Sequence, residues 1–286
     1  QAEDGIRDRS PSRGLGDVYK RQVLHWPRPL HLVLISRVAP PLPVADLRAK
    51  GQLTELRAHD LRFIRGEIAA YAALALPAPL SESGVALFEA RTEGWATGLR
   101  LATLTLRAGE DPAAIIASLT GSDPAFADYL MDEVLSRQPP NVQTFLLRTS
   151  ILDRFCASLC EAVLASEESK YDARACIDWV ERANLFIIPL QGHEWYRYHH
   201  LFRDALLQRL RAEVAPEQVA ELHRRAAAWF AERSLTDEAL HHALSANDFE
   251  LATGIMQQKL VDVLNQEDRP TLERWVRLLA EDFVQH

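Results

Sequence analysis

The most informative segment of the sequence is Trp195-Tyr-Arg-Tyr-His-His-Leu-Phe-Arg-Asp-Ala-Leu206. An apolar, β-prone run, Asn184–Leu190, precedes it, and the intervening Gln191-Gly-His-Glu194 is typical of a tight turn. Leucines at 201, 206, 207 and 210 then recur at helical spacing. The pattern therefore predicts a β-hairpin whose second strand runs directly into an amphipathic helix.

Two adjacent histidines, His199 and His200, fall at the point where this strand meets the helix. Unpaired backbone N–H groups and the helix dipole favour an anion at such a helix start. A histidine in this place can add a side-chain contact to a phosphate. The alternative is a junction histidine that only caps the helix, and the segment by itself leaves both interpretations open.

The segment Tyr196-Arg-Tyr-His-His-Leu-Phe-Arg-Asp204 resembles the "MHD" segment in the winged helix of STAND-type signalling ATPases. It is most similar to the MalT-like branch of LuxR-type transcription activators. In that family the first histidine of the pair senses the β-phosphate of bound ADP and locks the resting state. The resemblance implies that His199 takes this position and that His200 replaces the acidic residue of the wider motif, as is usual in the MalT-like branch.

Composition limits the classes of function. The 286 residues are enough for two or three small domains with real cores. Forty acidic and 32 basic side chains give a net charge of −8, so the whole chain is not a nucleic-acid-binding surface. No apolar run approaches the roughly 20 residues that a membrane helix needs. Three cysteines without metal-ligand spacing indicate buried thiols in a reducing compartment, so we expect a cytoplasmic chain with no membrane partner.

The first 22 residues have almost no apolar periodicity. Ser10–Gly16 is not a phosphate loop, because it lacks the terminal Lys-Ser/Thr pair and no strand precedes it. The segment is not a signal peptide either, since no apolar core follows. It resembles a translated sequencing-adapter read-through, and a natural disordered tail is the alternative. We leave residues 1–22 out of the predicted fold.

A near-continuous apolar run, Leu30-His-Leu-Val-Leu-Ile-Ser36, predicts a strand buried on both faces of a parallel sheet. Arg37 follows it, at the end where open α/β sheets bind ligands. A short helix near 44–50 and a second strand, Gln52–Leu56, would complete one βαβ crossover. Because a doubly buried strand needs neighbours on both edges, we expect an incomplete sheet, the C-terminal remnant of a nucleotide-binding α/β domain.

The segment Leu32-Val-Leu-Ile-Ser-Arg37 also resembles the sensor-1 strand of MalT-like ATPases. The resemblance implies that Arg37 is the sensor arginine facing the γ-phosphate region; an arginine solvated at a strand end is the alternative. The Gly-rich Walker A loop with its Lys and Thr, and the acidic Walker B strand, are absent from this sequence. We therefore expect no catalytic residues and no ATP hydrolysis. ATP or ADP with Mg is implied for the full-length protein, a slow ATPase switch at most, and neither should bind tightly to this chain.

Further along, Ser81 is expected to be the N-cap of a helix. The segment Arg91-Thr-Glu-Gly-Trp-Ala-Thr-Gly-Leu99 then places Gly94 and Gly98 around Trp95. Such glycines let a helix start pack closely against another backbone, with the tryptophan as a large apolar anchor. The segment is similar to the Gly-Trp-x-x-Gly-Leu motif that MalT-like proteins carry in place of Gly-x-Pro. The resemblance implies that Gly94 and Trp95 lie against the nucleotide base and sugar. The alternative is that Trp95 is simply part of the core.

Helices are expected near 142–149, 152–163 and 173–183, and together with the hairpin they predict a winged helix. Its third helix carries Asp178 and Glu181 beside two arginines, which is not basic enough for a DNA-reading helix. Beyond the winged helix, further helices are expected at 217–231, 237–244, 248–264 and 271–279. Within them, Glu238–Phe249 resembles the opening of the tetratricopeptide-like superhelix of MalT-like proteins.

The predicted fold is mainly α: a truncated α/β ATPase remnant, a helical subdomain, a winged helix and the start of a tetratricopeptide-like superhelix. The histidine pairs at 199/200 and 241/242 are adjacent rather than four apart and diverge on a helix, so no metal site is expected. Five domains are expected: a non-native or disordered tail (1–22), the C-terminal ATPase remnant (23–65), the helical subdomain (66–137), the winged helix (138–212) and the first helical hairpins of the sensor (213–286).

Because its three motifs occur in family order, the sequence is identified as an internal fragment of a MalT-like regulator. The resemblance implies an ATP/ADP-controlled, inducer-responsive transcription activator, to which this chain contributes the ADP-sensing winged helix and the start of the sensor domain. The implied partners are a small-molecule inducer or regulatory protein at the superhelix, further copies of the protein in the active state, and DNA only through a missing C-terminal domain. The alternative is a helical-repeat protein–protein interaction scaffold without nucleotide binding.

Overall fold

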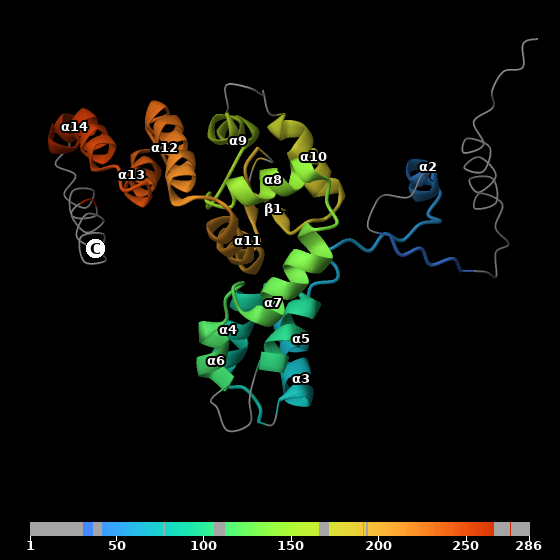
Figure 1. Cartoon of the computed structure of the whole chain (residues 1–286). Helices are drawn as coiled ribbons and strands as arrows, with labels where there is room; N and C mark the ends of the chain where they lie inside the picture. Colours follow the sequence, from blue (N-terminus) through green and yellow to red (C-terminus); the bar gives the residue numbers. More distant parts are fainter. Residues whose placement is uncertain are drawn as a thin grey trace, which may run out of the picture. The chain divides into compact units, whose positions relative to one another are not determined.

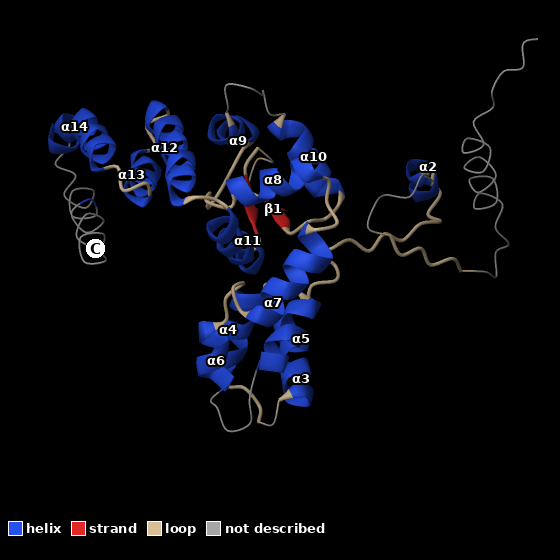
Figure 2. Ribbon diagram, in the orientation of Figure 1, coloured by secondary structure: helices blue, strands red, loops and turns tan. Residues whose placement is uncertain are grey.

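A computed structural model describes residues 31–36, 42–76, 78–105, 112–165, 172–190, 192, 194–265 and Trp275 (Figure 1). The chain divides into two compact units, Gln1–Leu61 with Arg182–Asn184, and Arg62–Glu181 with Leu185–His286. Within the described residues the architecture is mainly helical, and the only named strands are a short antiparallel pair (Figure 2). The predicted mainly-α class is confirmed.

In the first unit, the predicted βαβ crossover is not formed. Its helix is present as α2 (Val44–Ala49), but residues 31–36 and 52–56 adopt no strand. Val33 is 80% exposed and Ile35 is 96% exposed, so the prediction of a strand buried on both faces was wrong. The physical reason is that a strand needs a paired neighbour, and strand pairing among the described residues is confined to the segments around the hairpin. Arg37 lies outside the described residues.

The second unit begins with a group of helices that we call the helical subdomain. Its core contains Phe88, Leu99 and Phe126, all fully buried. The hydroxyl of Ser81 accepts a hydrogen bond from the Gly84 backbone N–H at 3.2 Å, so Ser81 is the N-cap that the sequence predicts. The bounds of its helices are α3 (Arg65–Ala75), α4 (Glu82–Thr92), α5 (Ala96–Thr105), α6 (Pro112–Ser118), α7 (Pro124–Asp128) and a π-helical continuation, η1 (Tyr129–Leu135).

The winged helix follows in the predicted order of helices and hairpin (Figure 2). In the hairpin, Ile187 lies opposite Tyr198, and Pro189 lies opposite Tyr196. The Tyr198 hydroxyl is buried and lies 2.7 Å from the Thr149 hydroxyl of the first helix. The bounds are α8 (Pro140–Thr149), α9 (Ala157–Leu164), α10 (Ala173–Arg182), β1 (Ile187–Pro189), β2 (Tyr196–Tyr198) and α11 (His200–Glu213).

One helix of this domain starts later than predicted. The sequence pattern places the helix start at Leu152, whereas α9 begins at Ala157. The backbone N–H and C=O of Phe155 both pair with Tyr196, each at 2.8 Å, so this residue extends the hairpin instead of joining the helix. An apolar run at helical spacing does not reveal such a non-local backbone pairing.

The last described helices pack one against the next, α12 on α13 and α13 on α14. They are α12 (Pro216–Glu232), α13 (Thr236–Ser245) and α14 (Phe249–Asn265), each starting within one residue of its predicted position. Of the further helix predicted near 271–279, only Trp275 is described. None of the helices in the described part of the chain is long and apolar enough to cross a membrane.

Candidate functional site

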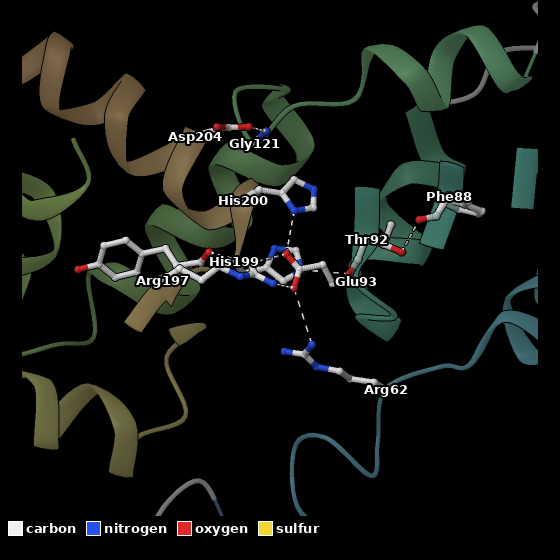
Figure 3. A network of polar contacts seen from close by, with 10 residues as sticks. Arg62, Phe88, Thr92, Glu93, Gly121, Arg197, His199, His200 and Asp204 are labelled. Atoms are coloured by element: carbon white, nitrogen blue, oxygen red, sulfur yellow. Dashed lines mark hydrogen bonds and ion pairs between the residues drawn. The ribbon is translucent and has the colours of Figure 1, made fainter. Parts of the chain in front are cut away.

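A sharp turn at the end of α4 forms one side of the candidate site. Glu93 and Gly94 adopt left-handed backbone conformations, with φ of 47° and 71°. A Cβ atom added at Gly94 would lie 2.5 Å from the carbonyl oxygen of Phe63, whose N–H donates a hydrogen bond to the Gly94 carbonyl at 2.8 Å. Position 94 therefore requires glycine. The turn presents the Thr92 carbonyl and the Glu93 carboxylate to the winged helix (Figure 3).

Glu93 is the centre of an ion-pair network between the helical subdomain and the winged helix. Arg197 of β2 donates to both of its carboxylate oxygens, at 2.9 and 3.0 Å, and Nδ1 of His200 lies 2.9 Å from one of them. Arg62 adds a weaker ion pair at 3.7 Å (Figure 3). Burial disfavours the charge of Glu93, but the hydrogen bonds from His200 and Arg197 outweigh it and hold the pKa of this carboxyl well below its usual value.

His199 is only 2% exposed and connects the winged helix to the same turn. Its Nε2 lies 3.0 Å from the Thr92 carbonyl oxygen. Because a carbonyl can only accept, this nitrogen carries the proton. Burial lowers the pKa of His199 to about 4, although the charge of Glu93 acts in the opposite direction. The second ring nitrogen, Nδ1, is buried and has no hydrogen-bond partner among the described residues.

Trp95 lies directly beside His199 in an aromatic cluster. Its ring centroid is 6.0 Å from that of His199, 4.9 Å from Phe186 and 5.8 Å from Tyr129. A Cβ atom at Gly98 would lie 2.5 Å from the indole, so the second glycine of the motif makes room for the ring. Trp95 is half-buried. The indole therefore packs into this junction, and Trp95 as a whole remains partly exposed.

A second close contact joins the helical subdomain to α11. The Gly121 backbone N–H donates to the Asp204 carboxylate at 3.4 Å. A Cβ atom at Gly121 would lie 1.8 Å from the Leu201 carbonyl oxygen, which is far inside contact distance. Helix α11 also packs on α4, α7 and η1. The start of α11, where His200 begins the helix and His199 precedes it, is therefore held from more than one side.

The structure brings three of the four predicted site residues together: Gly94, Trp95 and His199 lie at one junction, whereas Arg37 is not among the described residues. His199 is the residue before α11, but its side chain makes no capping hydrogen bond. It reaches Thr92 instead, 107 positions away in the chain. The interpretation of His199 as a simple helix cap is therefore wrong, and its role in nucleotide sensing stays a prediction.

Sequence reasoning did not identify Glu93 and Arg197 as site residues. The two lie 104 positions apart, so no local spacing relates them. The one available signal is an acidic residue immediately before the Gly-Trp motif. A carboxylate at the end of a helix is unfavourable beside the negative end of the helix dipole, unless it has a cationic partner elsewhere.

Glu93, His199 and His200 offer metal-type donor atoms within 4.8 Å of one another. Both carboxylate oxygens of Glu93 are already engaged by Arg197, and Arg62 contributes another positive charge. A divalent cation would have to displace one guanidinium and tolerate the other. We assign no metal to this cluster, and the expected absence of a metal site stays a prediction.

Comparison with known proteins adds the following similarities. Residues 131–219 match the family model described as the MalT winged helix domain. The chain is 34% identical over 256 residues to the serine/threonine-protein kinase PknK of Mycobacterium tuberculosis. The matched region covers 89% of this chain and 23% of the kinase.

Similar identity is found to the HTH-type transcriptional regulator MalT. The match is 33% over 255 residues in Yersinia enterocolitica, covering 87% of this chain and 28% of that protein. With MalT of Serratia proteamaculans the identity is 32% over 268 residues, and the match covers 92% of this chain and 29% of that protein. The chain spans about a quarter of the length of the curated relatives that it matches. The chain is thus MalT-like: residues 131–219 match the MalT winged helix domain, and most of the chain is similar to one segment of MalT-type transcription regulators.

Proposed function

We propose that this chain is the nucleotide-sensing junction of a MalT-like transcription regulator. The Gly94-Trp95 loop would lie against the base and sugar of ADP, and His199 would contact the β-phosphate. Binding of ADP would hold the winged helix against the helical subdomain in a resting state. Exchange of ADP for ATP, together with binding of an inducer to the helices from α12 onwards, would release the winged helix from the helical subdomain.

The observation that carries this proposal is the unpartnered Nδ1 of His199. A buried polar atom without a partner costs about 1–3 kcal/mol, and a ligand would relieve that cost. Trp95, beside His199, is only half-buried, and its indole is the kind of aromatic ring on which a base can stack. The half-exposed guanidinium of Arg62 adds the positive charge that attracts a phosphate.

The names of the relatives support a control function for the shared segment. The same segment occurs in proteins named as a kinase and as transcription regulators, so we infer that its role is common to both. A sensing module fits that requirement, whereas phosphoryl transfer or DNA reading would belong to other parts of the full-length proteins. ATP or ADP with Mg, an inducer, self-association, DNA contact through another domain and a cytoplasmic location are accordingly proposed for the whole protein, and no reaction is assigned to this chain.

The test is a calorimetric titration of ADP into the 286-residue chain and two variants. We expect weak binding that His199→Ala reduces about tenfold or more, the equivalent of one lost charge-assisted hydrogen bond. The exposed His241 of α13 provides the control, and His241→Ala should bind as the wild type does. Absence of binding heat, or binding unchanged by His199→Ala, would reject the proposal. It would favour a helical-repeat scaffold built on the packing of α12, α13 and α14.

A further inference from the structure

The hydrogen bond to Thr92 determines which ring nitrogen of His199 carries the proton. Since the Thr92 carbonyl accepts from Nε2, the neutral ring has its lone pair on Nδ1. An anionic oxygen also brings lone pairs, so it cannot form a hydrogen bond with Nδ1 in this state. Contact with a phosphate at Nδ1 therefore requires a second proton on the ring, taken from solvent, which makes His199 a cation without breaking its bond to Thr92.

The charged and titratable groups around His199 come from several elements. Arg62 precedes α3, Arg197 lies on β2 and His200 begins α11, and each is cationic or can become so. Among the residues that the structure describes, Glu93, at the end of α4, is the one negative group in direct contact with them (Figure 3). Its carboxylate lies within 4.8 Å of the ring nitrogens of His199 and His200 that could act as ligands. Among these neighbours, Glu93 alone favours a proton on His199, whereas Arg62 and His200 oppose it.

Glu93 also binds residues on both sides of His199 in the sequence. It binds Arg197, two residues before the histidine, and His200, one residue after it. The strand-to-helix junction is therefore fixed to the α4 turn on both sides of His199. This arrangement keeps the imidazole in reach of the Thr92 carbonyl, which belongs to the residue adjacent to Glu93.

We propose that Glu93 is the positioning residue of the histidine sensor: it holds His199 against the Thr92 carbonyl, which sets the resting tautomer, and supplies the negative charge against which His199 gains a proton when a phosphate binds. Anion binding at this junction is thereby coupled to proton uptake. The inference rests on the proposed function in one respect, namely that the bound anion is the β-phosphate of ADP.

The first part of the test uses the chain without nucleotide. Nuclear magnetic resonance of ¹⁵N-labelled histidines reports which nitrogen of His199 carries the proton and at which pH the ring titrates. We expect the proton on Nε2, and Glu93→Gln should shift the titration of His199 about one pH unit lower, as expected for loss of a nearby opposite charge. Glu89→Gln is the matched control, because Glu89 lies one turn earlier on α4 and pairs with Arg65. A proton on Nδ1, or a titration unchanged by Glu93→Gln, would overturn the assignment of Glu93.

The second part measures proton uptake on ADP binding, by calorimetry in buffers of different ionisation enthalpy. We expect uptake of about one proton above the level in His199→Gln, whose amide can still donate to Thr92 but cannot gain a proton. This measurement on the wild type stands even if Glu93→Gln does not fold. Binding with equal uptake in both proteins would overturn the coupling and leave the proposed function intact. No ADP binding at all would overturn both.

Discussion

At the scale of single residues, Gly94 meets the strictest geometric requirement of the site. We expect Gly94→Ala to lower the free energy of unfolding by about 1–3 kcal/mol, because the left-handed backbone disfavours a side chain and its Cβ meets the Phe63 carbonyl. Urea unfolding measures the change. Gly66→Ala is the control: Gly66 is exposed in α3 with no atom within 4 Å of an added Cβ, so alanine should be neutral or stabilise by up to about 1 kcal/mol. The reverse order of the two variants would contradict the role assigned to the turn.

The same residues show what sequence reasoning can detect. The close backbone approach at Gly94 and the cap at Ser81 were predictable, because each depends on a residue type and its immediate neighbours. The importance of Glu93 was not predictable, because its two hydrogen-bonded partners, Arg197 and His200, lie 104 and 107 positions away. The tautomer of His199 was hidden for the same reason, since it is set by a carbonyl on another element.

At the scale of elements, the bidentate pair between Glu93 and Arg197 is the main polar tie between α4 and β2. In a double-mutant cycle with Glu93→Gln and Arg197→Met, we expect a coupling free energy of about 1–2 kcal/mol, since Glu93 is 14% exposed and Arg197 36%. The i,i+4 pair of Glu133 and Arg137, 48% and 53% exposed, is the control and should couple by less than about 0.5 kcal/mol. Urea unfolding of the four proteins of each cycle gives both values. Equal coupling in the two cycles would show that the Glu93 pair is an ordinary surface contact.

Helices and strands were predictable where residues close in sequence determine them. The start of each helix from α12 to α14 lies within one residue of its prediction, because the apolar spacing of each helix and its termini are local signals. The strand predicted at 30–36 failed because a strand depends on partners that its own sequence cannot specify. The four apolar side chains at positions 32–35 are instead exposed. The late start of α9 has a similar origin in the pairing of Phe155 with Tyr196.

At the scale of the whole molecule, buried histidines predict loss of stability in mild acid. His199 is buried, and the Nδ1 atoms of His223 and His242 lie 2.8 Å apart between α12 and α13. Burial lowers the pKa of all three imidazoles, so the unfolded chain binds more protons than the folded chain below about pH 6.5. The free energy of unfolding should therefore fall as the pH decreases from about 6.5 towards 4, by up to about 1.4 kcal/mol per pH unit for each histidine.

Urea unfolding at a series of pH values between 7 and 4.5 measures this slope. The depressed pKa of Glu93 gives a stabilisation that is present above the unfolded value of about 4.5 and lost only at lower pH, so it does not contribute in this window. His242→Leu should flatten the slope, whereas His241→Asn, a change at an exposed neighbour, should leave it unaltered. Stability that is constant or increases towards pH 4.5 would contradict the burial of neutral imidazoles.

Gly121 illustrates how a residue without a side chain can affect the position of the His199 imidazole. The volume that a methyl group would need there is already filled by the Leu201 carbonyl oxygen, so only a hydrogen atom fits. We expect a larger residue there to push the first turn of α11 outwards. Because that turn begins directly after His199, the imidazole would be pulled from Thr92 by one added carbon atom, with every charged residue of the network left unchanged.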